Sequence, residues 1–94
     1  MALKYPEGWG VINRDGTQML SRAYEFDDFT GAMSFAVRLG EVADEYDHHP
    51  EITVSWGRTH VLWWSHDEGG ISSQDILLAE KTDWSYLQRQ VRSC

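Results

Sequence analysis

The stretch EITVSWGRTHVLWWSH, residues 51–66, decides the fold. From Ile52 to Trp56 apolar and polar side chains alternate, which is typical of a half-buried strand. Gly57-Arg58 suits a two-residue turn, and Thr59 to His66 predicts a second strand. Both faces of this second strand carry large side chains, so we expect it to lie in the centre of a sheet or to be covered on both sides.

A second hairpin is predicted upstream of this stretch. Asp15-Gly16, within the run Asn13 to Gly16, is a strong signal for a tight turn between antiparallel strands. Trp9 to Ile12 predicts a short strand before the turn, and Met19 to Phe26 predicts a longer one after it.

Two helices are predicted, one after each hairpin region. Asp27 and Asp28 favour a helix start, and apolar residues follow at helical spacing from Phe29 to Tyr46. Pro50 disfavours helical geometry at the residue before it, so this helix ends near there. The second helix is expected from Ser73 to Val91.

The start of the second helix carries its own capping signal. Ser72 is followed three residues later by Asp75, a spacing that predicts a capping box. The order is thus strand, strand, helix, strand, strand, helix. This order predicts an α+β fold, with a four-stranded antiparallel sheet and helices packed on one face. A chain of 94 residues favours one domain over residues 1–94.

Leu77, Trp84 and Val91 recur every seven residues along the second helix. Such a heptad seam suits pairing with a partner helix. The alternative is that these residues dock on the sheet of their own chain.

The composition excludes some classes of function. With 15 acidic and 8 basic residues, the net charge of −7 argues against direct nucleic-acid binding and against an anionic membrane surface. No apolar run approaches the roughly 20 residues of a membrane span, and we see no signal peptide. The one cysteine, Cys94, cannot form an intramolecular disulfide, which favours a reducing compartment such as the cytoplasm.

Three histidines are candidates for chemistry. His48 and His49 lie between the first helix and the next strand, and His66 ends the last strand, so the hairpin should bring all three to one end of the sheet. Histidine titrates near neutral pH and suits proton transfer. The alternative for each is a solvated, capping or core role. A zinc site would need His66 with a carboxylate such as Asp44 or Asp67.

Other side chains have simpler explanations. A catalytic triad with Ser65 is weak, because Ser65 only adjoins His66 in sequence. Trp56, Trp63 and Trp64 fit strand positions in the core. Trp9 lies outside the periodic segments and is a candidate aromatic wall for a flat heterocycle.

Several of these residues together resemble the signature of pterin-4a-carbinolamine dehydratases. That pattern is an acid, His-His-Pro four residues on, an aromatic, a further His and then an Asp. The resemblance covers about residues 8–88, although only residues 1–7 precede Gly8-Trp9, where the family usually has an extra helix. The matching positions are Asp44, His48, His49, Pro50, Trp56, His66 and Asp75, with Gly8-Trp9, Arg22, Phe26 and residues 70–72 around them.

The resemblance implies a reaction, namely the loss of water from a 4a-hydroxytetrahydropterin to give quinonoid dihydropterin, in the recycling of tetrahydrobiopterin. It implies no metal and no cofactor. His48 and His66 would be the proton-transfer pair, and His49 would hold and orient the pterin. Which histidine acts as acid and which as base stays open.

The resemblance also implies the residues that bind the ring. The loop backbone at Pro50 and from Ser65 through Asp67 to Glu68 would hydrogen-bond it, and Trp9 would flank the pocket. Asp44 would reach a hydrogen-bonding edge of the ring. Asp75 would support the site indirectly.

A binding role is the main alternative. Relatives act as dimerisation cofactors for a homeodomain transcription factor, which would imply a nuclear location, and others are non-catalytic scaffolds. The retained histidine set favours the enzyme. The resemblance further implies a homodimer or homotetramer built through the Leu77, Trp84 and Val91 side of the last helix, which could also receive a protein partner.

Overall fold

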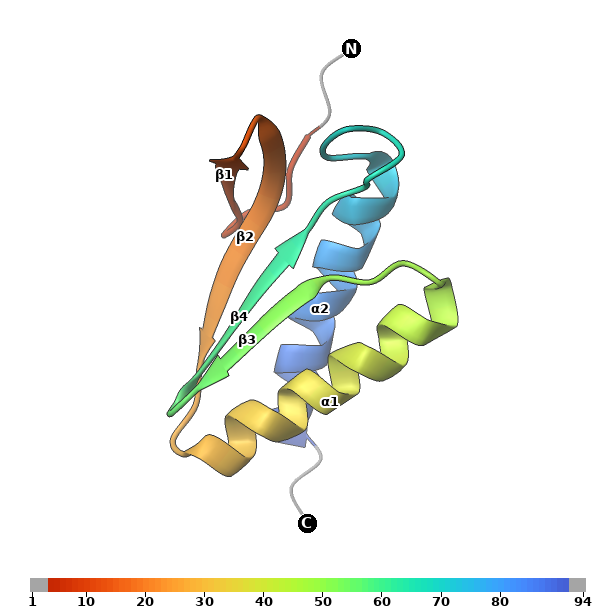
Figure 1. The fold of residues 1–94 in the computed structure, drawn as a ribbon. Coiled ribbons are helices and arrows are strands. Elements are labelled where there is room, and N and C mark those ends of the chain that lie inside the picture. Colours follow the sequence, from red (N-terminus) through yellow and green to blue (C-terminus); the bar gives the residue numbers. More distant parts are fainter. Residues whose placement is uncertain (1–3, 92–94) are drawn as a thin grey trace.

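The computed structural model describes residues 4–91, with side chains as far as residue 88. The chain forms two hairpins, each followed by a long helix (Figure 1). This arrangement confirms the α+β fold. The elements are β1 (Gly10–Arg14), β2 (Thr17–Glu25), α1 (Phe29–Tyr46), β3 (Glu51–Ser55), β4 (Arg58–Trp63) and α2 (Ser73–Val91).

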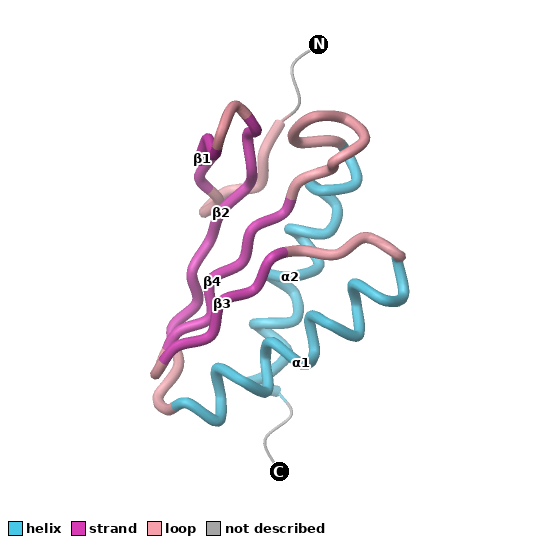
Figure 2. The backbone as a smooth tube through the Cα atoms, viewed as in Figure 1, coloured by secondary structure: helices cyan, strands magenta, loops and turns pink. Residues whose placement is uncertain are grey.

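The four strands form one antiparallel sheet in the order β1-β2-β4-β3. β4 therefore lies between β2 and β3, as the bulk on both of its faces predicts. Both helices cover the same face of the sheet, with α1 across β3 and β4 and α2 along β2 and β4 (Figures 1 and 2).

The core lies between β4 and the helices. Thr59, Val61 and Trp63 alternate along β4 toward the helices and are fully buried. The two polar atoms in this row are satisfied: the Thr59 hydroxyl donates to the carbonyl of Ala32 at 2.8 Å, and the Trp63 indole N–H donates to the Thr82 hydroxyl at 3.0 Å. Buried polar groups need such partners, so both bonds fix how the helices sit on the sheet.

The hairpin turn between β3 and β4 differs from the prediction by one residue. Ser55 pairs with Arg58, so the turn is Trp56-Gly57 rather than Gly57-Arg58. Gly57 has φ +72°, the conformation that favours glycine at the second turn position. The core position expected for Trp56 is wrong, because the turn leaves its side chain 73% exposed.

The last strand is shorter than predicted. β4 ends at Trp63, and beyond it Ser65 pairs with Gly70 in an isolated bridge that closes a tight loop. Trp64 is half-buried on the helix-free face, so only Trp63 of the three strand tryptophans is a core residue. The other turn, Asp15-Gly16, is confirmed, and the positive φ of both residues is what a tight hairpin turn requires.

The ends of α1 are defined by two aspartates. The Asp28 side chain accepts a hydrogen bond from the Gly31 N–H at 2.8 Å, which confirms an acidic helix start. Asp47 follows the helix with φ +50°, in the left-handed region. This turn stops α1 and directs the next residues back toward the sheet.

The heptad side of α2 faces solvent. Leu77 is 43% and Trp84 61% exposed, so these two residues do not dock on the sheet of their own chain. The side chain of Val91, the third member, lies outside the described side chains. Neither helix in the described part of the chain has the length and apolar composition needed to cross a membrane.

Candidate functional site

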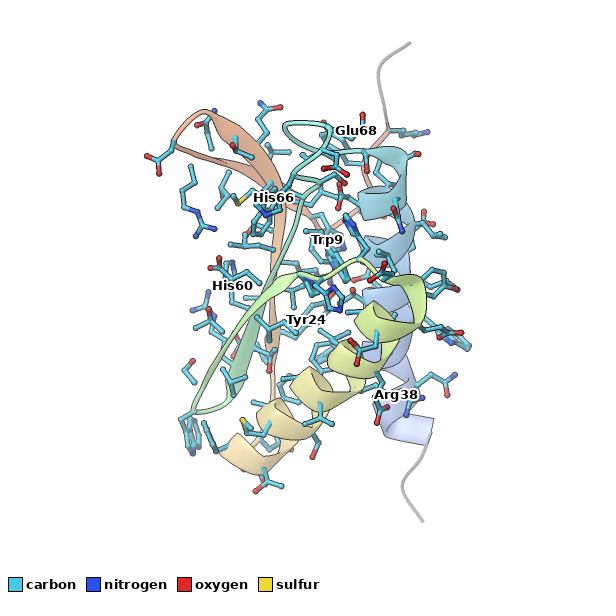
Figure 3. The ribbon with its side chains drawn as sticks, turned by 45° about the vertical axis from the view of Figure 1, so that its right-hand side comes forward. Trp9, Tyr24, Arg38, His60, His66 and Glu68 are labelled. Carbon is cyan, nitrogen blue, oxygen red and sulfur yellow. The ribbon has the colours of Figure 1, made fainter. Side chains whose placement is uncertain are left out.

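A polar cavity of about 420 Å³ lies at the end of the sheet where α1 ends and α2 begins. Three segments that are distant in sequence line it: the turn after α1, the loop after β4 and the start of α2. Figure 3 shows His66 and Glu68 on this loop. The lining residues are Asp47, His48, His49, Trp64, Ser65, His66, Asp67, Glu68, Ser72 and Gln74.

The β-sheet register brings the histidines together. Glu51 pairs with Leu62, so the residues just before β3 lie beside those just after β4. His48 and His49 therefore line the same cavity as His66. The prediction that the hairpin gathers these three at one sheet end is confirmed.

His48 is held by a buried carboxylate. Its Nε2 lies 2.6 Å from Oδ1 of Asp75, and the Asp75 side chain is fully buried. The imidazole also stacks on the Trp63 ring, with 5.8 Å between centroids and 7° between planes. One hydrogen bond and one stacked face fix the orientation of the ring.

Asp75 has a full set of donors. Its Oδ2 accepts from the Ser65 hydroxyl at 2.7 Å, and from the Ser72 N–H at 2.8 Å and hydroxyl at 3.0 Å. The contact with the Ser72 N–H is one half of the predicted capping box; the Ser72 hydroxyl donates to Asp75 and does not accept from its N–H as the other half requires. Because an ionised carboxylate only accepts hydrogen bonds, the geometry assigns a proton to Nε2 of His48.

The other ring nitrogen of His48, Nδ1, is then the one without a proton in the neutral ring. Nδ1 has no hydrogen-bond partner among the described residues. Every fully buried side-chain nitrogen or oxygen in that part of the chain does have such a partner. Nδ1 is therefore not fully buried, and His48 is one of the residues that line the cavity. In the neutral ring Nδ1 carries a lone pair, and Asp75 would stabilise the imidazolium formed when it takes a proton.

The other two histidines are more open. His49 Nε2 lies 2.9 Å from Oδ1 of Asp44, and both side chains are mostly exposed. His66 is exposed and packs edge-on against Trp64, with 5.2 Å between ring centroids. Its ring nitrogens have no hydrogen-bond partner among the described residues, so both can meet a ligand or solvent.

Only some of the predicted ring-binding residues line the cavity. Ser65, Asp67 and Glu68 line the cavity, whereas Asp44 touches it only through His49, and Pro50 is not among its lining residues.

Trp9 does not flank this cavity. It is 8% exposed in the core (Figure 3), and its indole N–H donates to Asp83 at 3.1 and 3.2 Å. The prediction of an aromatic wall at Trp9 is wrong because this hydrogen bond anchors the ring on α2, away from the histidines.

Four lining residues were missed by the sequence analysis: Asp47, Trp64, Ser72 and Gln74. Trp64 was assigned to the core, although its alternation with Trp63 puts it on the opposite face of the strand. Asp47 directly precedes the histidine pair in the sequence, and this position could have indicated that it lines the same site. Only the tertiary structure shows that Ser72 and Gln74 line the cavity, because it places the start of α2 there.

Two alternatives lose support from the geometry. Ser65 does approach His48, at 3.4 Å, but it contacts Nε2, the nitrogen already bonded to Asp75. A nucleophilic triad needs serine and aspartate on opposite ring nitrogens, so Ser65 is a structural partner. Within residues 4–91 no three His, Cys, Asp or Glu side chains are grouped to hold a metal ion.

The chain is similar to known proteins over most of its length. The family model for pterin 4 alpha carbinolamine dehydratase matches residues 1–84. A provisionally assigned pterin-4-alpha-carbinolamine dehydratase of Microcystis aeruginosa is 37% identical over 86 residues, covering 92% of this chain and 73% of the relative.

Two solved structures share the fold. A transcriptional coactivator/pterin dehydratase from Brucella melitensis has a TM-score of 0.75 at 31% identity, over 85% of this chain and 83% of that one. A pterin dehydratase-like protein identified as a RuBisCO assembly factor in the alpha-carboxysome has a TM-score of 0.71 at 15% identity, over 85% and 90%. The match over most of the chain shows that this protein belongs to the pterin 4 alpha carbinolamine dehydratase family.

Proposed function

We propose that the chain catalyses the dehydration of a 4a-hydroxytetrahydropterin to quinonoid dihydropterin and water. The observation that carries the proposal is the hydrogen bond of His48 to the buried Asp75, at the wall of a cavity that two more histidines line. A role in binding alone needs neither a fully buried carboxylate nor a histidine with an accessible second nitrogen.

The reaction needs one proton delivered and one removed. The C4a–O bond breaks with its electron pair, and the departing hydroxyl takes up a proton to become water. N5 loses its proton, and its electron pair forms the N5–C4a double bond. No net proton or electron is exchanged with solvent, so an acid and a base placed on either side of the ring are sufficient.

His48 is suited to the role of the base. Its accessible Nδ1 takes the N5 proton, and Asp75 stabilises the resulting imidazolium through Nε2. His66 is suited to the role of the acid, because it lines the same cavity and its ring nitrogens have no hydrogen-bond partner among the described residues. His49, steered by Asp44, lies beside them and orients the substrate.

The acidic residues of the cavity fit the remaining edge of a pterin. Asp47, Asp67 and Glu68 contribute carboxylate acceptors, and the amino and ring N–H groups of the pterin are donors. These acceptors lie in the same cavity as the three histidines, so one flat ring can meet both sets.

The direct test is the rate of dehydration of 4a-hydroxytetrahydropterin, followed by absorbance in the presence of a chelator. We expect acceleration above the spontaneous rate that survives the chelator, and a loss of roughly 100-fold in His66→Ala. His60→Ala is the matched control, because His60 bonds Ser21 on the helix-free face of the sheet (Figure 3). Spontaneous rates with folded wild-type protein would contradict the proposal.

A second candidate function is assembly with another protein, either in place of or alongside catalysis. The exposed Leu77 and Trp84 on α2 favour it, because large apolar side chains that face water mark contact surfaces. The same side of α2 would serve a homodimer or homotetramer. Sedimentation of wild type and Trp84→Ser, with the dehydration assay on both, separates the roles: assembly without acceleration identifies a scaffold.

A further inference from the structure

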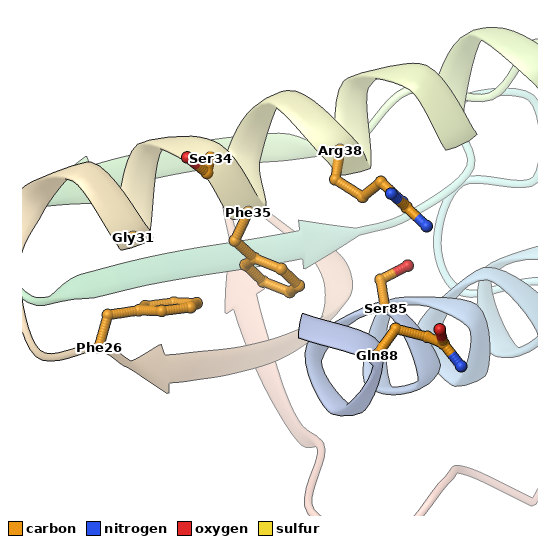
Figure 4. A pocket seen from close by; sticks show the side chains of 7 residues that line it. All are labelled: Phe26, Gly31, Ser34, Phe35, Arg38, Ser85 and Gln88. Atoms are coloured by element: carbon orange, nitrogen blue, oxygen red, sulfur yellow. The ribbon is translucent and has the colours of Figure 1, made fainter. Parts of the chain in front are cut away.

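A second cavity lies between α1 and α2, at the opposite end of the helix pair from the histidines. It measures about 270 Å³ (Figure 4). Its apolar side is formed by the rings of Phe26 and Phe35, and its polar side by Arg38 of α1 and by Ser85 and Gln88 of α2. One end of the cavity is therefore aromatic and the other can donate hydrogen bonds.

Arg38 differs from Arg14 and Arg22 in having no ion-pair partner among the described residues. Arg14 forms an ion pair with Glu51 at 2.7 Å, and Arg22 forms one with Asp83 at 3.1 Å. Arg38 is half-buried and makes no ion pair or hydrogen bond with any described residue. Figure 4 shows its guanidinium extending from α1 toward Ser85 and Gln88.

A half-buried arginine that has no ion pair or hydrogen bond among the described residues is unexpected in this chain. The sequence has 15 acidic residues against 8 basic ones, so acidic partners are abundant. Burying part of a guanidinium costs free energy that a carboxylate partner recovers through two parallel charged hydrogen bonds. The position of Arg38 beside two aromatic rings thus matches a ligand with an apolar body and one carboxylate.

We propose that this cavity binds a small aromatic monocarboxylate, with the ring against Phe26 and Phe35 and the carboxylate on Arg38. Engineered cavities of about 150 Å³ hold one benzene ring, so 270 Å³ accommodates a ring with a short acid side chain. Ser85 and Gln88 supply further donors for the carboxylate.

The charged residues beside the cavity favour a ligand that carries a single negative charge. The adjoining groove along the same helices contains Glu41 and Glu45 as well as Lys81 and Arg38. The two glutamates would repel a dicarboxylate or a phosphate more strongly than a monocarboxylate. A cationic ligand would meet Arg38 itself, so it is excluded from the cavity.

The test uses amide NMR spectra of the full chain titrated with 3-phenylpropanoate and, in parallel, with the neutral 3-phenylpropanamide. We expect shifts centred on Phe35, Arg38 and Ser85 with the acid, and binding at least 10-fold weaker with the amide. Arg38→Met should weaken binding of the acid by a similar factor. Arg58→Met, which removes an exposed turn arginine, is the control and should bind as wild type.

The outcomes that overturn the proposal are also specific. Equal binding of acid and amide, or equal loss in both arginine variants, would show that Arg38 does not recognise the carboxylate. Shifts at the same residues on simple dilution, without probe, would show that a second copy of the chain covers the cavity. Dehydratase activity of Arg38→Met should equal that of wild type, so failure here is distinguishable from failure of the proposed function.

Discussion

Two aspartates on α2, Asp75 and Asp83, lie eight residues apart and use their carboxylates differently. Asp75 accepts from His48, Ser65 and Ser72 at one end of the sheet. Asp83 accepts from the Trp9 indole, the Arg22 guanidinium and the Tyr24 hydroxyl, two turns further along the helix. The contacts at Asp83 join three segments of the fold: the loop before β1, β2 at two positions, and α2.

The two aspartates differ in the groups that donate hydrogen bonds to them. Trp9 and Arg22 keep their protons at any physiological pH, and burial together with Asp83 raises the pKa of Tyr24 well above its usual value. Asp83 therefore holds these segments together. Asp75 instead holds a histidine whose second nitrogen reaches a cavity. Under the proposed function, Asp75 supports chemistry whereas Asp83 stabilises structure, because only Asp75 has a histidine among its donors.

The largest expected effect is on catalysis at the Asp75 end. His48→Gln removes the titrating ring but keeps a polar side chain of similar reach, and we expect turnover to fall by roughly 100-fold or more. Stability should change little, because Asp75 keeps its serine donors. Stopped-flow dehydration assays and urea unfolding of the same samples measure both. Turnover within a factor of three of wild type would remove His48 from the mechanism.

The Asp83 end should show the opposite pattern. Asp83→Ala leaves Trp9, Arg22 and Tyr24 without their acceptor, which should lower the unfolding free energy by about 2–3 kcal/mol. Turnover of the folded protein should stay within a factor of two. Glu80→Ala, at an exposed position of the same helix, is the control and should change stability by less than about 0.5 kcal/mol. A drop in turnover without a drop in stability would contradict the comparison.

Asp75→Asn tests whether Asp75 positions His48 or only caps α2. The amide cannot serve as the same all-acceptor group, so we expect a loss of turnover of about 10- to 100-fold, smaller than when the histidine itself is lost. Nitrogen-15 NMR of His48 should show the Nε2-protonated form in wild type and a changed tautomer in the variant. Asp83→Asn should leave the His48 spectrum as in wild type. An unchanged His48 spectrum in Asp75→Asn would mean that Asp75 acts through the helix alone.

The smallest effect concerns alkaline stability. Because the folded state raises the pKa of Tyr24, the unfolded state loses that proton first, near pH 10. The Tyr24 contribution is therefore present below about pH 10 and declines above it, by up to about 1.4 kcal/mol per pH unit. Urea unfolding between pH 8.5 and 11 should show this slope in wild type and a weaker one in Tyr24→Phe. Identical slopes would show that other groups dominate.

Much of the fold follows from local sequence. Asp15-Gly16 specifies its hairpin, Asp28 starts α1, and Ser72 with Asp75 starts α2, because turns and helix caps depend on residues only a few positions apart. Alternation from Ile52 identifies β3, and large side chains on both faces identify β4 as a central strand. Where the expectation was wrong, at Trp56, a one-residue difference in the turn exchanged a core position for an exposed one, and no local pattern distinguishes the two.

The candidate site divides in the same way. The sequence alone makes His48, His49 and His66 candidates, since histidine chemistry is a property of the residue, and the family resemblance adds Asp75. The tertiary structure decided which nitrogen of His48 is accessible, because that depends on a carboxylate 27 residues away. It also decided that Trp9 donates its hydrogen bond to Asp83, 74 residues away, and does not line the cavity. Contacts of this kind follow from strand register and helix packing, which are set by burying the whole core at once and cannot be derived from any short segment.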